Sequence, residues 1–172
     1  MCGIAGYVGA KNAEPILTVA LERLKYRGYD SAGLAVATTS EIAVRRAPGK
    51  LIALAEVLAT TPLPGTCGIA HTRWATHGAP TQVNAHPHID NDGRLAVVHN
   101  GIIEYHETLR RELSAQGCTF RSQTDTEVIP HLLSTLYQGD PVAAIRGTVK
   151  RLEGAYSLAV IFADHPECIY AV

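Results

Sequence analysis

The sequence predicts a single domain of the α+β or layered α/β class, with helices packed on the faces of β-sheets. The chain has 172 residues, which is enough for one domain with a sizeable core. Its composition, 47% apolar and 18% charged, is typical of a globular protein. Short strand patterns alternate with helical patterns, and no repeat or linker interrupts them, so we expect residues 1–172 to form one unit.

The first half of the chain predicts a strand, a helix, and then more strands around a short helix. The apolar run Gly3–Gly9 is typical of a buried strand. A helix is expected from about Asn12, a favourable N-cap residue, and Gly28 is expected just past its end. The inner face of this helix is expected to carry Ile16, Ala20, Leu21 and Leu24. Beyond it we expect two strands, a short helix and another strand, over Gly33–Thr38, Glu41–Arg46, Leu51–Ala59 and Cys67–Arg73.

The second half predicts three helices between strands. An apolar strand over Arg94–Gly101 ends at an Asn-Gly pair. The helices are expected over Tyr105–Gln116, Thr126–Gln138 and Pro141–Leu152. Thr124 or Asp125 is the expected cap of the second helix, and Asp140 that of the third. The last strands are expected over Tyr156–Ala163 and Cys168–Val172. Because the final strand has no polar tail, we expect the chain to be a piece of a longer polypeptide.

Charge and hydropathy exclude several classes of function. The formal net charge is -1, from 15 basic and 16 acidic residues without long runs of either sign, so we expect no nucleic-acid partner and no membrane partner. The longest apolar stretch, Ala155–Ala163, is far shorter than the ~18 residues of a membrane span. The sequence shows no secretory signal, so a cytoplasmic location is expected.

The cysteine pattern does not predict a metal site. The four cysteines are widely spaced and form no C-x-x-C pair: Cys2, Cys67, Cys118 and Cys168. Two disulfides are the weaker interpretation without a secretory signal. We expect Cys67, Cys118 and Cys168 to be small, mostly buried thiols. The histidines His86 and His88 in "NAHPHID" are expected to be hydrogen-bonding loop residues, so neither a metal nor a cofactor is predicted.

Cys2 stands directly after the initiator methionine and can be a nucleophile. Removal of Met1 would give Cys2 a free α-amine, whose pKa is ordinarily about 7.7–8.0, beside a thiol of about 8.5. The amine could then accept the thiol proton, directly or through one water. A buried N-terminal cysteine without a function is the alternative. The absence of a signal sequence argues against lipid attachment, and Cys2 alone leaves the other two interpretations open.

Two further motifs could complete a site. "HTRWATHGAP" follows a predicted strand, and its Arg73, beside hydroxyl and backbone donors, suits a carboxylate; an exposed polar loop is the alternative. "VVHNGIIEY" places Asn100 and Gly101 side by side, where an amide and an N–H group could form an oxyanion hole. A hairpin turn is the alternative there. "YRGYDSAG", which contains Asp30, is expected to support the site.

A third motif, "SQTDTEV", offers a carboxylate for a substrate ammonium group. Asp125 is the residue concerned, and a helix cap is its alternative role. Together the motifs would provide a thiol, oxyanion donors, a carboxylate clamp and an ammonium clamp. Glutamine is the simplest molecule that combines an α-carboxylate, an α-ammonium group and a hydrolysable acyl group.

The chain resembles the class II glutamine amidotransferase domain of the glutamine–fructose-6-phosphate aminotransferases, also called glucosamine-6-phosphate synthases. The resemblance rests on five motifs, which follow in this order along the chain: "MCGI", "YRGYDSAG", "HTRWATHG", "HNGIIEY" and "SQTDTEV". The resemblance implies the N-terminal-nucleophile hydrolase fold, a four-layer αββα sandwich. It implies that Cys2 is the nucleophile and that Asn100 with Gly101 forms the oxyanion hole. The residues it implies at the carboxylate end of glutamine are Arg73, Trp74, Thr76 and His77. Asp125 and Gly101 are implied to hold the amine.

The resemblance also predicts partners. Ammonia released from glutamine would aminate fructose 6-phosphate in sugar-isomerase domains of the same polypeptide, and the full-length form would be a homodimer. The glutaminase domains of amidophosphoribosyltransferase, asparagine synthetase and glutamate synthase are alternatives, but "RWATHG" and "YRGYDSAG" fit them less well. A non-catalytic interaction domain is disfavoured because the clamp residues are all present, and a His/Cys metal-binding module because the ligand spacing is missing.

Overall fold

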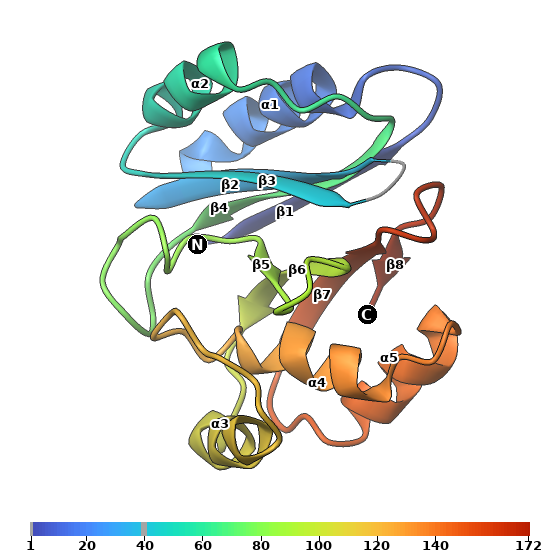
Figure 1. Ribbon diagram of the computed structural model, residues 1–172. Helices are drawn as coiled ribbons and strands as arrows, with labels where there is room; N and C mark the ends of the chain where they lie inside the picture. The colour runs from blue at the N-terminus through green and yellow to red at the C-terminus, as the bar shows by residue number, and fades with distance from the viewer. Residues whose placement is uncertain (1, 39–40) are drawn as a thin grey trace.

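The chain folds into four layers (Figure 1). The computed structural model describes residues 2–38 and 41–172. Two four-stranded antiparallel sheets lie face to face, helices α1 and α2 cover one of them, and α3, α4 and α5 lie on the outer side of the other. The predicted α+β class and the implied αββα sandwich are confirmed. Met1 lies outside the described residues, and its predicted removal stays a prediction.

The first sheet has the strand order β1-β4-β2-β3. Its strands are β1 (Gly3–Val8), β2 (Ser31–Ala37), β3 (Ile42–Pro48) and β4 (Cys67–Arg73). The helices outside it are α1 (Ala13–Leu24), followed by the 3₁₀ turn η1 (Lys25–Arg27), and α2 (Leu51–Thr60). Every residue of β2 and β4, the two central strands, is buried. Gly3 of β1 pairs with Thr72 of β4, so the antiparallel register brings Cys2 to the end of β4 at Arg73.

The second sheet has the order β5-β6-β7-β8. Its strands are β5 (His88–Ile89), β6 (Leu95–Gly101), β7 (Tyr156–Phe162) and β8 (Tyr170–Ala171). The helices are α3 (His106–Ala115), α4 (Val128–Leu136) and α5 (Pro141–Val149). The two-residue strand β5 falls where a loop was predicted, because Pro87 hides the pattern of an extended segment. The predicted strand over Cys168–Val172 is shortened to the two residues of β8 that pair with β7.

Small and branched apolar side chains fill the space between the sheets. This inter-sheet cluster contains Ala35, Ala37, Ile42, Cys67, Ile69, Ala96, Val98, Ala159 and Ile161. Two larger clusters lie outside it, one between the first sheet and α1 and α2, the other between the second sheet and the remaining helices. The site described below lies at one end of this sandwich. No helix in the described ranges is both long and apolar enough to cross a membrane.

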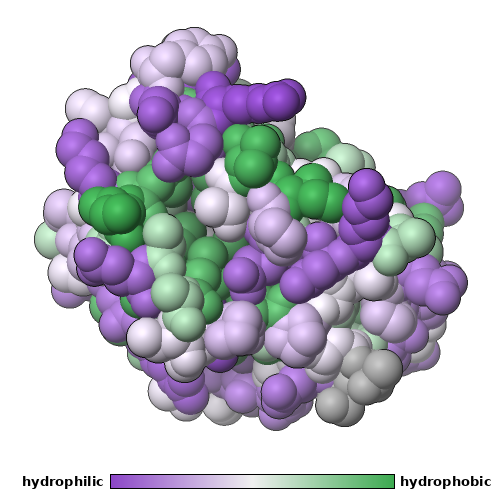
Figure 2. Space-filling model, turned by 90° about the horizontal axis from the view of Figure 1, so that it is seen from above, coloured by the Kyte–Doolittle hydropathy of each residue, from purple (hydrophilic) through white to green (hydrophobic). Residues whose placement is uncertain are grey.

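The predicted inner face of α1 is largely wrong. The buried residues are Ala13, Leu17 and Leu21, which repeat every four residues, so only Leu21 was assigned correctly and Leu24 is only partly buried. Ile16 and Ala20 instead line a groove of about 490 Å³ with Pro15, Val19 and Arg23. Figure 2 looks onto the layer of α1 and α2 and shows hydrophobic residues exposed between hydrophilic ones. Because α1 is apolar on two sides, periodicity alone does not identify the side that packs on the sheet.

The predicted helix caps are confirmed in two places and wrong in one. Asn12 accepts a hydrogen bond from Glu14 N–H at 3.4 Å, and Asp140 accepts two, from Val142 N–H and Ala143 N–H, at 2.9 and 3.1 Å. Neither Thr124 nor Asp125 caps α4. The helix begins after a turn, with Glu127 at the N-cap position and no side-chain cap bond. The carboxylate of Asp125 has a distant partner instead, as described below.

All four cysteines are free thiols. Cys67 is buried as expected and Cys118 is partly buried, but Cys168 is exposed, contrary to the prediction. Cys168 precedes the short edge strand β8, where the chain runs along the surface. Burial and the neighbouring Cys168 raise the pKa of Cys67 to about 11, so the Cys67 thiol stays protonated at neutral pH and is a poor nucleophile.

Candidate active site

A cavity of about 490 Å³ collects most of the predicted site residues at one end of the sandwich. Seven of them line it: Cys2, Arg73, Trp74, Thr76, Asn100, Gly101 and Asp125. They come from the start of β1, the end of β4, the end of β6 and the loop before α4. The eighth, His77, does not line the cavity. Segments far apart in sequence therefore meet where the sequence motifs predicted a common site.

The thiol of Cys2 lies against the segment that follows β4. Trp74 N–H donates to Cys2 Sγ at 3.1 Å, and Sγ lies 3.6 Å from Trp74 O. The pairing of β1 with β4 sets this position, since Gly3 is opposite Thr72 and the next residue toward the N-terminus meets Arg73 and Trp74. An N–H group directed at sulfur stabilises negative charge there. The Cys2 side chain is only partly buried, which leaves it accessible from the cavity.

Arg73 is buried, yet it both lines the cavity and holds the loop that follows β4. Its guanidinium donates to the carbonyl oxygens of His77 at 2.5 Å, Gly78 at 3.0 Å and Ala79 at 3.4 Å. Burial lowers the pKa of Arg73, and the nearby carboxylates of Asp30 and Asp125 oppose this; the group stays cationic at neutral pH. A carboxylate bound at Arg73 would therefore share the guanidinium with these carbonyl groups.

Asp30 fixes the same loop from the other side. Asp30 Oδ2 accepts a hydrogen bond from Ala75 N–H at 2.5 Å, and Ser31 Oγ donates to Asp30 Oδ1 at 3.0 Å. The backbone N–H of Asp30 also donates to Arg73 O at 2.8 Å. The motif "YRGYDSAG" therefore supports the cavity wall, as the sequence predicted.

Trp74 is 55% exposed, and its ring lies close to Gly28 of the same motif. A Cβ at Gly28 would lie 3.3 Å from the Trp74 ring.

Gly101 ends β6 in a conformation that requires glycine. Its φ is 123°, and a Cβ at this position would lie 2.2 Å from the carbonyl oxygen of Ala155, the residue directly before β7. The neighbouring Asn100 lines the same cavity, and its Oδ1 lies 2.9 Å from His71 Nε2 of β4. The Asn-Gly pair is therefore the end of a sheet strand rather than a hairpin turn, which corrects the alternative interpretation.

The carboxylate of Asp125 is buried, with 3% of the residue exposed. Its Oδ2 accepts a hydrogen bond from Ile103 N–H at 2.8 Å. Its Oδ1 lies 3.8 Å from His77 Nδ1, too far for a hydrogen bond. His77 itself has a partly exposed ring packed edge-on against His106, with centroids 5.1 Å apart. Asp125 thus keeps one oxygen available toward the cavity, while His77 contributes its carbonyl group to Arg73.

Six residues line the cavity that were not predicted as site residues: Arg27, His86, His99, Ile102, Thr124 and Thr126. Five of them lie within motifs that were noticed for other residues: Arg27 in "YRGYDSAG", His99 and Ile102 in "HNGIIEY", and the two threonines on either side of Asp125. The spacing of the chain gives no signal for His86, which was predicted to be a hydrogen-bonding loop residue. It packs instead against other imidazole rings.

Four buried histidines form a cluster beside the cavity: His71, His86, His88 and His99. The ring of His86 lies 4.3 Å from that of His71, 4.9 Å from that of His88 and 6.3 Å from that of His99. Burial lowers the pKa of His71 and of His88 to about 3, that of His99 to about 4, and that of His86 well below its usual value. All four rings are therefore neutral at pH 7. Within the described residues, no group of three or more His, Cys, Asp or Glu side chains could hold a metal ion.

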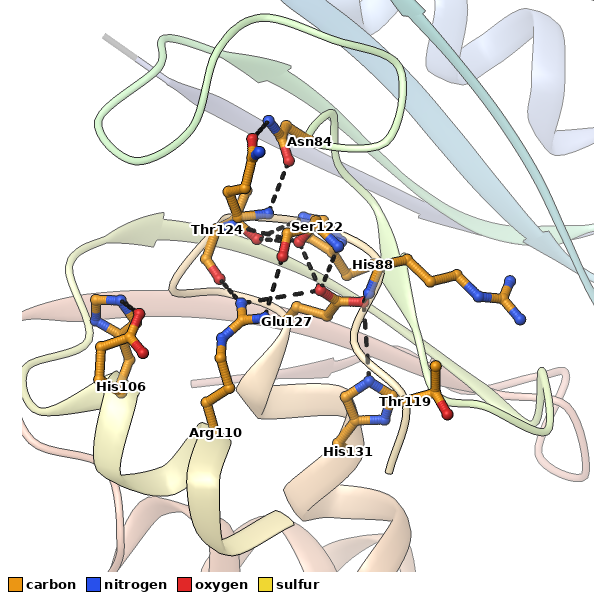
Figure 3. A network of polar contacts seen from close by, with 12 residues as sticks. Asn84, His88, His106, Arg110, Thr119, Ser122, Thr124, Glu127 and His131 are labelled. Carbon is orange, nitrogen blue, oxygen red and sulfur yellow. Dashed lines mark hydrogen bonds and ion pairs between the residues drawn. The ribbon is translucent and has the colours of Figure 1, made fainter. Parts of the chain in front are cut away.

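Glu127 anchors the loop that carries Asp125 (Figure 3). Its carboxylate accepts hydrogen bonds from Arg121 N–H at 2.8 Å, Ser122 N–H at 2.7 Å and Ser122 Oγ at 2.7 Å. The loop is also held by Arg110, which donates to Ser122 O and Thr124 O at 3.1 and 2.9 Å. Of the predicted hydrogen-bonding histidines, His88 contacts Thr124 Oγ1 at 3.0 Å.

Hydrogen bonding determines the charge of Glu127. Burial alone would raise the pKa of this carboxyl group, but His131 and the donors of Arg121 and Ser122 together lower it to about 2. His131 Nε2 is 3.9 Å away, so we assign the lowering chiefly to the three donors at 2.7–2.8 Å. Glu127 is therefore a buried carboxylate that holds the backbone before Asp125 in place.

Comparisons with known families and curated proteins agree with one another. The family model described as "glutamine amidotransferase domain" matches residues 71–172. Proteins named glutamine–fructose-6-phosphate aminotransferase (isomerizing) are similar along the whole chain. The one from Thermus thermophilus is 54% identical over 171 residues, and the one from Gluconobacter oxydans is 58% identical over 168. The chain spans 28% and 27% of the length of these relatives.

Solved structures show the same fold. Glutamine phosphoribosylpyrophosphate amidotransferase from B. subtilis, complexed with ADP and GMP, superposes with a TM-score of 0.79 at 25% identity, covering 95% of this chain and 35% of that one. A structure described as the allosteric regulatory enzyme of purine biosynthesis gives a TM-score of 0.81 at 25% identity, covering 95% of this chain and 36% of that one.

The role of Glu127 predicts a pH-dependent stability. Because the carboxyl group binds its proton more tightly in the unfolded chain, Glu127 stabilises the fold fully above about pH 4.5, and this stabilisation is lost as the pH falls toward about 2. Glu127→Gln should lower the free energy of unfolding at pH 7 by about 2–3 kcal/mol, and by clearly less at pH 3. Urea unfolding at both pH values measures this. The exposed Glu56→Gln is the matched control, and equal losses for Glu127→Gln at the two pH values would contradict the assignment.

Proposed function

The chain belongs to the glutamine amidotransferase domain family, and we propose that its cavity hydrolyses glutamine to glutamate and ammonia with Cys2 as the nucleophile. The observation that carries this proposal is the composition of one cavity, which is lined by the thiol of Cys2, the guanidinium of Arg73, the amide of Asn100 and the carboxylate of Asp125. Glutamine offers a complementary group to each of them: an amide carbon, a carboxylate, a carbonyl oxygen and an ammonium group.

In the proposed reaction, Cys2 Sγ attacks the side-chain amide carbon of glutamine, and its proton passes to the α-amine of Cys2. The carbonyl oxygen becomes an oxyanion, which Asn100 and Gly101 stabilise. When the C–N bond breaks, the proton goes to the leaving nitrogen and ammonia departs, leaving a thioester on Cys2. Water then attacks the thioester, releases glutamate and restores the thiol.

Substrate binding is proposed to use the two charged groups at the cavity wall. The α-carboxylate of glutamine binds at Arg73, with Thr76 and the ring of Trp74 beside it. The α-ammonium group binds the oxygen of Asp125 that Ile103 N–H does not occupy, next to Gly101. His77 acts from outside the lining, through the carbonyl group that Arg73 holds. These roles extend the predictions made from the motifs.

The ammonia is proposed to aminate fructose 6-phosphate, giving glucosamine 6-phosphate. The similarity to the aminotransferases named above supports this, since it extends along the whole chain. The fructose 6-phosphate site would lie in sugar-isomerase domains of the same polypeptide, which would form a homodimer in the cytoplasm. The phosphoribosylpyrophosphate amidotransferases share the fold and are the alternative.

Replacement of the nucleophile should abolish turnover. We expect Cys2→Ala to lower kcat for glutamine hydrolysis at least about 10³-fold while glutamine still binds, because the clamps remain. Ammonia release and calorimetric titration measure the two effects. Cys168→Ala removes an exposed thiol, and Cys67→Ala a buried one, so both serve as controls that keep activity. Appreciable glutaminase activity in Cys2→Ala would exclude Cys2 as the nucleophile.

The clamp and the oxyanion donor should differ in their kinetic effects. Arg73→Ala removes a buried contact made in both ground and transition states, so we expect KM to rise at least about 30-fold with a smaller change in kcat. Asn100→Ala removes a donor directed at developing charge, so we expect kcat to fall about 10²–10³-fold with little change in KM. Steady-state kinetics separate these outcomes. A rise in KM alone for both variants would contradict the assignment.

Titration calorimetry can test whether glutamine binds to this chain and fructose 6-phosphate binds elsewhere in the polypeptide. A glutamate analogue should bind the 172-residue chain, and fructose 6-phosphate should give no heat, because the sequence has no phosphate-binding loop of the strand–loop–helix type. Phosphoribosylpyrophosphate, the substrate of the alternative enzyme class, is the parallel control. Micromolar binding of fructose 6-phosphate to this chain would show that the sugar site lies within these residues.

A further inference from the structure

A side-chain hydrogen bond joins the two sheets beside the cavity. His71 of β4 lies in the first sheet and Asn100 of β6 in the second, and His71 Nε2 is 2.9 Å from Asn100 Oδ1. His71 is fully buried and does not line the cavity, whereas Asn100 does. The imidazole is thus placed to act on the amide of Asn100 and not on a bound substrate.

We propose that His71 is a positioning residue, which donates its Nε2–H to Asn100 Oδ1 and so turns the amide NH₂ group of Asn100 toward the reacting carbonyl oxygen. This inference rests on the proposed function, in which Asn100 is an oxyanion donor. An asparagine amide is nearly symmetric in shape, and rotation by 180° exchanges its oxygen and nitrogen. Without a fixed donor behind it, the amide could present its oxygen, which would repel the oxyanion.

The surroundings of His71 make it a donor with one proton. Burial is the main cause that lowers its pKa to about 3; the nearby His99 ring and the cation of Arg73 lower it too, while the contacts with Asn100 and with the His99 backbone oppose the lowering. A neutral ring carries one N–H group, and Asn100 Oδ1 can only accept a hydrogen bond. Nε2 therefore holds the proton. Nδ1 is buried and makes no hydrogen bond of regular geometry to the part of the chain that the structure describes, although the His99 backbone lies close enough to raise the pKa of the ring.

The hydrogen bond between His71 and Asn100 also connects the two strands that carry the proposed substrate-binding and oxyanion-binding groups. His71 stands two residues before Arg73 on β4, and Asn100 directly precedes Gly101 at the end of β6. The hydrogen bond therefore links the strand that carries the carboxylate clamp to the strand that carries the oxyanion donors. Preorganised donors of this kind cost no reorientation when charge develops in the transition state.

A double-mutant cycle tests whether His71 acts through Asn100. His71→Phe keeps an aromatic ring but removes the donor, and we expect kcat for glutamine hydrolysis to fall about 10–100-fold with KM within about threefold. His71→Gln, whose amide can donate, should recover part of the loss. In the Asn100→Ala background, His71→Phe should cause no further loss. Losses that multiply would show that His71 acts independently of Asn100 and would overturn the proposal.

The wild-type protein offers a test that does not depend on folding of a variant. Imidazole ¹⁵N spectra of the protein labelled at histidine should show His71 with the proton on Nε2 and with no titration between pH 5 and 9. A proton on Nδ1, or titration in this range, would overturn the proposal.

If Asn100→Ala lowers kcat but His71→Phe does not, only the role of His71 fails. If Cys2→Ala keeps full activity, the proposed function fails, and the tautomer measurement still stands.

Discussion

The antiparallel pairing of β1 with β4 is the constraint on which the site depends. Gly3 lies opposite Thr72, and this register carries the N-terminal thiol to Arg73 and Trp74 without any loop to position it. A shift of one residue would exchange the two faces of β1 and move Cys2 away from the cavity. The Cys2 thiol, the proposed nucleophile, is thus positioned by the hydrogen bonds of the sheet that begins at the next residue.

The face-to-face packing of the sheets completes the arrangement. The first sheet supplies the thiol and Arg73, and the second supplies Asn100, Gly101 and the loop of Asp125, so neither sheet contains a full site. The small side chains between the sheets, such as those of Ala35 and Ala96, allow the strand ends to meet around one cavity. Loosening of the inter-sheet core would therefore separate Cys2, the proposed nucleophile, from Asn100 and Gly101, the proposed oxyanion donors.

The sequence predicted most strands and most residues of the cavity, but it did not predict which groups form hydrogen bonds with those residues. β4 was predicted with its observed bounds, because a turn cluster at Thr61–Thr66 precedes it and its apolar first half, Cys67–Ala70, is typical of a buried strand. Asp125 was recognised, but its partner Ile103 lies 22 residues earlier, and no local pattern distinguishes that contact from a helix cap. The sequence also did not predict the hydrogen bonds from Arg73 to the carbonyl groups of the loop after β4, since they depend on how the chain turns back there.

The neutral histidines beside the cavity bear on which group moves protons. His86 and His99 line the cavity, yet burial lowers the pKa of His99 to about 4 and that of His86 well below its usual value. Groups that bind protons so weakly are poor general bases at neutral pH. The carboxylate of Asp125 is assigned to the substrate ammonium group, and Arg73 stays protonated. Of the groups assigned to this cavity, the α-amine of a processed Cys2 is the one with an ordinary pKa near the working pH, so the burial of the histidines favours it as the base.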